Sequence, residues 1–83
     1  MEPRLAIVRG VAAIVRRVLL CGELDPEKDN FQSLGGTSIE AVHVLSLLEI
    51  EYGESLSFED LWEAATIASI ADRIQAARRC AAS

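Results

Sequence analysis

Apolar residues that recur three and four positions apart are the feature of this chain that most restricts its fold. Over residues 4–20 aliphatic side chains keep that spacing while arginines occupy the other side, which predicts an amphipathic α-helix. Pro3 suits its first turn, and Cys21-Gly22 is expected to end it, because glycine is common just past a helix. The expected core stripe is Leu5, Val8, Val11, Ile14, Val15, Val18 and Leu19.

Two more long helices are predicted, each preceded by a residue that can cap it. One follows Thr37, covers residues 38–52 and stops at Gly53. The other follows Thr66 and covers residues 67–80, after which the chain is expected to fray. The core stripe of that last helix is Ile67, Ile70, Ala71, Ile74 and Ala77.

A short helix and a long loop complete the predicted fold. Ser57 can cap the short helix, with Phe58, Leu61 and Trp62 facing inward. The loop at residues 23–36 contains turn residues, and its length requires apolar anchors. The elements together predict an all-α bundle of four helices, three long and one short, with residues 1–83 as a single domain. The expected loop anchors are Leu24, Phe31 and Leu34.

Charge and composition exclude several classes of function. The net charge is −5, and no Lys or Arg occurs between Asp29 and Asp72, an interval with nine acidic residues. Such a surface repels nucleic acids and anionic membranes. It either attracts basic patches on protein partners or keeps an Ala- and Leu-rich bundle in solution. No apolar run is long enough to span a membrane and the N-terminus lacks a signal-peptide layout, so we expect a cytoplasmic protein. We also expect a monomer.

The residues offer no metal site and no nucleophilic triad. Cys21 and Cys80 are far apart without CxxC spacing, so free thiols are expected rather than a disulfide. The chain has one histidine, which is too few for a zinc set. That residue, His43, is either a general base or a surface contact.

The second helix is apolar on more than one side. A helix of this kind is either deeply buried or keeps one side for a partner, and burial on all sides is hard to arrange in a small bundle. Its expected core stripe is Ala41, Val44, Leu45, Leu48 and Tyr52. The predicted partner surface is Ile39, Val42, His43, Leu47 and Ile50.

The stretch Leu-Gly-Gly-Thr-Ser-Ile-Glu at residues 34–40 is the candidate functional site. Gly35 and Gly36 free the backbone to turn, and Thr37 can cap the helix in a capping box with the glutamate that ends the stretch. Ser38 then takes the first helical position, where unpaired N–H groups and the helix dipole favour an anion such as a phosphodiester. On these residues alone, a plain helix start is the preferred explanation, because a glycine pair followed by a Thr or Ser cap is common before helices.

This stretch resembles the modification site of the carrier-protein family, the acyl and peptidyl carriers of fatty-acid, polyketide and nonribosomal-peptide synthesis. In that family the serine of a Gly-Gly-x-Ser or Asp-Ser motif bears a phosphopantetheine arm. The resemblance covers about residues 5–77 and holds without gaps from Gly35 to Ala71. It rests on Phe-x-x-Leu-Gly-Gly before the serine, Gly53 followed by Leu56, the run Trp62-Glu63-Ala64-Ala65-Thr66 and the run Ile67-Ala68-Ser69-Ile70-Ala71.

Three positions depart from the family pattern. Thr37 stands where His or Asp is frequent, Ala65 where many carriers have Pro, and Trp62 where Phe is common. Thr37 leaves the carrier subtype open, although the glycine pair favours the peptidyl or aminoacyl side. None of the three removes the hydroxyl of Ser38, whose nearby rivals are Ser33 and Thr37.

The resemblance implies that a phosphopantetheinyl transferase uses coenzyme A and a divalent metal to place 4′-phosphopantetheine on Ser38. It further implies thioester cargo, an adenylating or acyl-loading enzyme, and downstream condensing or tailoring enzymes. Ser38 is then a tether rather than a catalyst, so the chain is not expected to be an enzyme. The alternative is a helical docking domain that never carries an arm. The chain begins with Met, which fits a discrete carrier acting in trans, and an excised module domain would look the same.

Overall fold

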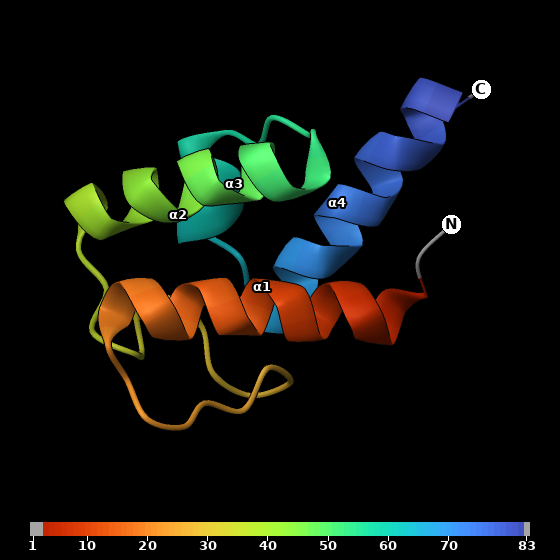
Figure 1. Ribbon diagram of the computed structural model, residues 1–83. Coiled ribbons are helices and arrows are strands. Elements are labelled where there is room, and N and C mark those ends of the chain that lie inside the picture. Colours follow the sequence, from red (N-terminus) through yellow and green to blue (C-terminus); the bar gives the residue numbers. More distant parts are fainter. Residues whose placement is uncertain (1–2, 83) are drawn as a thin grey trace.

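In the computed structural model, residues 3–82 form four α-helices, and side chains are described for residues 3–78. These are α1 (Arg4–Leu19), α2 (Ser38–Tyr52), α3 (Phe58–Trp62) and α4 (Ile67–Ala82). Figure 1 shows α1 and α2 antiparallel, with α4 crossing α1 and α3 lying against α2. The predicted all-α fold of three long helices and one short helix is confirmed. No helix within the described range is long and apolar enough to cross a membrane.

One cluster of buried side chains from all four helices and the first loop forms the core. Each fully buried aliphatic or aromatic side chain in it contributes about 1.5–3 kcal/mol through removal from water. α1 supplies the predicted Val8, Val11, Ile14 and Val15, and adds Ile7 and Ala12. The other helices and the loop supply Phe31, Ala41, Val44, Leu48, Tyr52, Leu61, Ile67, Ala68, Ile70, Ala71 and Ile74.

The sequence placed parts of α1 and α4 wrongly. Leu5 was expected in the core but is 58% exposed. The last residue of α2 lies opposite Gly10, so α2 ends before it can cover the first turn of α1. α1 stops at Leu19, and Leu20, not Gly22, takes the left-handed conformation with φ 55°. α4 continues to Ala82, past the predicted end at Cys80, and Ser83 lies outside the described residues. The expected fraying of the chain end stays a prediction.

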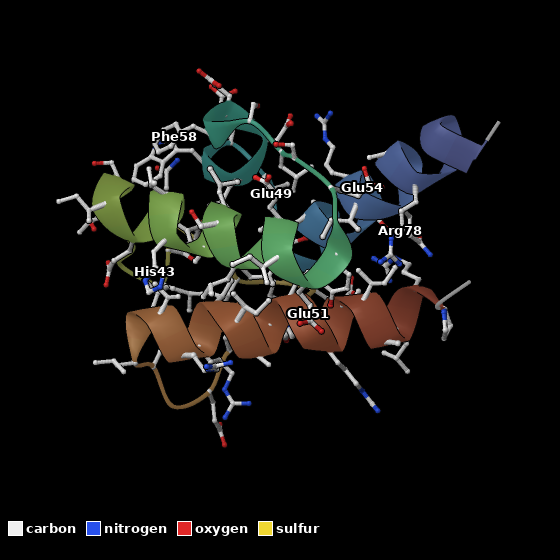
Figure 2. All side chains as sticks on the ribbon, turned by 45° about the horizontal axis from the view of Figure 1, so that its top comes forward. His43, Glu49, Glu51, Glu54, Phe58 and Arg78 are labelled. Carbon is white, nitrogen blue, oxygen red and sulfur yellow. The ribbon has the colours of Figure 1, made fainter. Side chains whose placement is uncertain are left out.

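The joint between α1, α2 and α4 explains a glycine inside a helix. A Cβ at Gly10 would collide with the hydroxyl of Tyr52, so the glycine lets the two helices approach closely. The guanidinium of Arg78 lies 5.2 Å from the centre of the Tyr52 ring, and its Nη2 donates to the Tyr52 carbonyl at 3.4 Å. Figure 2 shows Arg78 reaching from α4 to the C-terminal end of α2. These contacts fix that end of α2 in the bundle.

The loop between α1 and α2 is anchored by the three predicted apolar side chains. Phe31 is 1% exposed, and Leu24 and Leu34 are half-buried against the core. The loop also caps α4, since the amides of Ile67 and Ala68 donate to loop carbonyls at 2.8 Å each. These bonds satisfy N–H groups that a helix start leaves unpaired. The loop is therefore held both by its apolar anchors in the core and by its hydrogen bonds to α4.

Ion pairs and a second cap tie the same region together. Arg4 Nε lies 2.7 Å from the Asp72 carboxylate and Arg4 Nη1 lies 3.4 Å from that of Glu27. The hydrogen bond and the charge of Asp72 raise the pKa of Arg4 above its ordinary value. The amide of Ser69 donates to Thr66 Oγ1 at 3.2 Å, which confirms Thr66 as the predicted cap of α4. α1, the loop and the start of α4 therefore form one connected frame.

Candidate functional site

The two glycines before α2 are needed for different reasons. Gly35 has a left-handed φ of 83°, and a Cβ there would meet nothing within 4 Å. Gly36 has no positive φ, but a Cβ there would overlap the ring of Phe31. The first glycine therefore supplies a backbone conformation that other residues adopt at a cost, and the second supplies close contact with a core ring.

Thr37 begins α2 as the sequence predicts. The amide of Glu40 donates to Thr37 Oγ1 at 3.2 Å, and the amide of Thr37 donates back to Glu40 Oε1 at 3.0 Å. This reciprocal pair is the predicted capping box. A cap of this kind stabilises a helix by about 0.5–2 kcal/mol, so it fixes where the first turn begins.

Ser38 is the first residue of α2, and its side chain is exposed. Among the residues that the structure describes, its hydroxyl has no hydrogen-bond partner, and neither do the amides of Ser38 and Ile39. The capping box uses the other two N–H groups of this turn, those of Thr37 and Glu40. The hydroxyl thus stands beside two available donors at the positive end of a helix dipole, an arrangement that accepts a phosphate oxygen.

The two rival hydroxyls near Ser38 are both engaged. Ser33 Oγ accepts from the amide of Asn30 at 2.9 Å and donates to the Asn30 carbonyl at 2.9 Å. Thr37 Oγ1 accepts from the amide of Glu40 in the cap. Ser38 therefore has the hydroxyl that a modifying enzyme reaches without first breaking a structural hydrogen bond.

An exposed apolar surface continues along α2 from Ser38. Ile39, Val42 and Ile50 are 81%, 55% and 80% exposed, and His43 is exposed as well. We call these four residues the α2 strip. Leu47, predicted with them, is half-buried against the core, so its assignment to the free surface is wrong in part.

Two leucines lie at the boundary between the α2 strip and the core. The fully buried positions of α2 are Ala41, Val44, Leu48 and Tyr52, which form one narrow stripe. Leu45 was expected within that stripe but is half-buried like Leu47, because the two positions flank it on either side. Neither leucine is wholly core or wholly surface.

Acidic side chains surround the C-terminal half of α2. Figure 2 shows Glu49 and Glu51 on that helix and Glu54 just after it. Glu49 and Glu51 are exposed, and no Lys or Arg occurs from residue 29 to residue 72. The field beside the α2 strip is therefore negative, and it attracts a positively charged surface.

Aromatic rings connect the site loop to α3. The ring of Trp62 lies 5.9 Å from that of Phe31 and is stacked on Phe58 at 5.4 Å, centre to centre. The side-chain amide of Gln32 donates to the Trp62 carbonyl at 2.8 Å. Trp62 therefore packs, as predicted, and it holds the loop that carries Gly35.

Comparison with known proteins identifies the family. Residues 9–74 match the family described as the phosphopantetheine attachment site. The chain belongs to this family. It is a carrier domain whose family binds 4′-phosphopantetheine covalently, which confirms the carrier prediction and the predicted cofactor.

A solved carrier protein shares the fold. The structure of BlmI, a type-II acyl-carrier-protein from Streptomyces verticillus involved in bleomycin biosynthesis, superposes with a TM-score of 0.80 at 33% identity. The match covers 88% of this chain and 87% of that chain. The all-α carrier fold is thus found in a protein of nearly the same extent.

Two curated relatives are very large proteins. Tyrocidine synthase 3 of Brevibacillus parabrevis is 41% identical over 51 residues, which is 61% of this chain and 1% of that protein. A mycosubtilin synthase component of Bacillus subtilis is 36% identical over 75 residues, which is 90% of this chain and 3% of that protein. This carrier domain therefore corresponds to a small part of each synthase.

One feature of the carrier site was not foreseen from the sequence. Phe31 was expected as a loop anchor but not as the ring that requires a glycine at residue 36. The signal was available, because Phe31 and Gly36 belong to the same Phe-x-x-Leu-Gly-Gly motif. The amide of Gly36 also donates to the Phe31 carbonyl at 3.1 Å, so the chain folds back on itself between the two.

Proposed function

We propose that this carrier domain holds aminoacyl, peptidyl or acyl intermediates as thioesters in nonribosomal-peptide or related natural-product biosynthesis, with Ser38 as the attachment residue. The observation that carries the proposal is the exposed hydroxyl of Ser38, which has no partner among the described residues and lies beside two available amides. The relatives support the pathway class, since their names are those of peptide synthases and of a carrier involved in bleomycin biosynthesis. The glycine pair favours the peptidyl or aminoacyl subtype.

The residues around Ser38 suit a phosphodiester. Gly35 and Gly36 add no side chain that would obstruct a transferase. The capping box of Thr37 sets the direction of the first turn, and the amides of Ser38 and Ile39 can donate to phosphodiester oxygens. When bound, phosphopantetheine supplies a terminal thiol that holds the cargo as a thioester. The chain itself then contributes position rather than catalysis, and we propose that it is not an enzyme.

The α2 strip is proposed as the surface that partner enzymes cover. These are a phosphopantetheinyl transferase, an adenylating or acyl-loading enzyme, and condensing or tailoring enzymes. The acidic residues beside the strip would draw in a partner with a basic rim. We further propose that residues 1–83 act as one monomeric domain in the cytoplasm, without nucleic-acid or membrane partners.

Intact-mass measurement tests the attachment residue. The chain is incubated with coenzyme A, Mg²⁺ and a broad-specificity phosphopantetheinyl transferase, and one phosphopantetheine should be added. Ser38→Ala should remove the addition and leave the helical circular dichroism unchanged. Ser46→Ala, a second exposed serine of α2, is the matched control and should be modified fully. Modification of the Ser38→Ala variant, or none of the wild type, contradicts the proposal.

Charge substitution tests the α2 strip. Val42→Asp should fold normally, because Val42 is 55% exposed, but it should slow loading or transfer. Leu48→Asp should instead unfold the domain, because Leu48 is 1% exposed and cannot keep a carboxylate in water. A Val42→Asp variant that is loaded at the wild-type rate by every partner enzyme would remove the strip from the proposal.

A further inference from the structure

The outer side of α1 carries arginines that have no acidic partner. Arg9, Arg16 and Arg17 are exposed, and within the part of the chain that the structure describes none of them forms an ion pair. By contrast, Arg4 pairs with two carboxylates and Arg73 lies 3.6 Å from that of Asp60. Within the described residues, the outer side of an otherwise acidic domain therefore carries three arginines that no carboxylate pairs with.

A shallow, open hollow lies between Arg16 and Arg17 at the C-terminal end of α1. It has a volume of about 290 Å³ and is lined by Ala13, Arg16, Arg17 and Cys21. The small side chain of Ala13 leaves room between the two longer guanidinium stems. We call this feature, together with Leu20, the α1 hollow.

Leu20, which directly precedes Cys21 of this lining in the chain, adds an exposed apolar side chain next to it. It is 89% exposed and has a left-handed φ of 55°, a conformation that leucine rarely adopts. Gly22, two residues later, could take that conformation without strain but does not. Because most of its side chain is exposed to solvent, Leu20 can contact another molecule.

The α1 hollow lies at the same end of the domain as Ser38 but on another side. Figure 1 shows α1 and α2 antiparallel, so the last turn of α1 lies beside the first turn of α2. Ala13, Arg16 and Arg17 are exposed, whereas the buried positions of α1 face the other helices, so the α1 hollow is on the outer side of α1. A helix is about 10–12 Å across, which exceeds the screening length of about 8 Å at physiological salt. The acidic surface of α2 is therefore largely screened from a molecule bound in the α1 hollow.

We propose that the α1 hollow is a second docking surface, and that its occupant is a short acidic segment of a partner protein with an apolar residue that contacts Leu20. Charge complementarity selects carboxylates for Arg16 and Arg17. The size of the basic surface selects a short segment, because a long polyanion or an anionic membrane would extend beyond α1 and meet a domain of net charge −5. Docking there leaves Ser38 and the α2 strip uncovered.

Fluorescence anisotropy tests this with a labelled peptide of repeated Glu-Leu-Ser-Glu units. Wild-type protein should bind it, and Arg17→Glu should weaken binding about tenfold, as expected when an attractive charge becomes repulsive. Arg17→Gln, which removes the charge without reversing it, should weaken binding less. Lys28→Glu is the matched control, since it makes the same change in net charge at an exposed loop residue, and it should bind like the wild type.

Salt dependence and a substitution of Leu20 distinguish the contribution of the arginines to binding from that of the apolar contact. The difference between wild type and Arg17→Glu should shrink as salt rises, whereas the weakening caused by Leu20→Ser should persist. Ser38→Ala should bind the peptide normally, so failure here is distinguishable from failure at the attachment residue. Equal weakening by Lys28→Glu and Arg17→Glu would overturn the proposal, because binding would then follow net charge alone. Competition by phosphatidylserine vesicles or duplex DNA as strong as by unlabelled peptide would also overturn it, in favour of a membrane or nucleic acid.

Discussion

Replacing Gly36 with alanine should destabilise the domain through a steric overlap with the ring of Phe31. The new Cβ would overlap the ring of Phe31, which is 1% exposed and cannot swing into solvent. Overfilling a packed core costs about 1–3 kcal/mol. Alanine also lowers the conformational entropy of the unfolded chain, which stabilises the folded state by about 0.4–1 kcal/mol. We therefore expect a net loss of about 1–2 kcal/mol in the free energy of unfolding, measured by urea denaturation with far-ultraviolet circular dichroism.

Gly35→Ala is the control that separates packing from backbone strain. Its Cβ would meet nothing, but φ is 83°, and a left-handed conformation costs a non-glycine residue about 1–2 kcal/mol. The two variants therefore lose similar stability for different reasons. Phe31→Leu destabilises the domain by itself, because it leaves space in the core. It removes ring atoms that a Cβ at residue 36 would meet, and none that a Cβ at residue 35 would meet.

The double variants decide between the two causes. Phe31→Leu with Gly36→Ala should lose less than the sum of the single losses, with a coupling of about 0.5–3 kcal/mol. Phe31→Leu with Gly35→Ala should be additive. Circular dichroism is the required probe, because Trp62 contacts Phe31 and its fluorescence would respond to the ring itself. Additivity in the Gly36 pair, or equal coupling in both pairs, refutes the steric explanation.

Three further predictions concern α2. Thr37→Ala should lower the free energy of unfolding by about 0.5–2 kcal/mol through loss of the cap, and a urea midpoint equal to that of wild type would contradict it. Leu48→Ala should cost about 2–5 kcal/mol, whereas Ile50→Ala, 80% exposed, should change stability by less than about 0.5 kcal/mol in the same assay. Attachment of phosphopantetheine to Ser38 should raise the free energy of unfolding by about 0.3–1 kcal/mol at low salt, because the phosphodiester lies at the positive end of α2. This gain should fade at high salt, and a gain that is independent of salt would argue against the dipole.

Local chemistry in the sequence predicted the start of each of the later helices. The capping boxes of Thr37 and Ser57 involve residues three positions apart, so they can be identified without knowledge of the fold. The same is true of Gly53, whose φ of 72° ends α2 as expected. The end of α1 was missed because a glycine near a helix end suggested the wrong residue, whereas Leu20 takes the left-handed position.

The orientation of α2 was harder to predict, because the helix is apolar on several sides. Periodicity separated Val44 and Leu48 from Ile39 and Ile50 correctly. It could not place the half-buried leucines, since their exposure depends on where α1 and α3 lie against α2. Long-range contacts such as Gly36 with Phe31 or Gly10 with Tyr52 also depend on the packed fold, and a sequence shows only that a glycine is present.

The separation of anchoring and exposed positions on α2 bears directly on the proposed carrier role. Ser38 and Ile50 lie on one rigid helix, so they stay roughly 18 Å apart along its axis, at 1.5 Å per residue. The capping box fixes the first turn, and the contact of Arg78 with Tyr52 fixes the last. Because neither end of the helix is left unsupported, the position of the Ser38 backbone relative to the α2 strip is set by the fold. A partner that binds the strip would therefore receive the serine in one position, and the arm's own flexibility would supply the remaining reach.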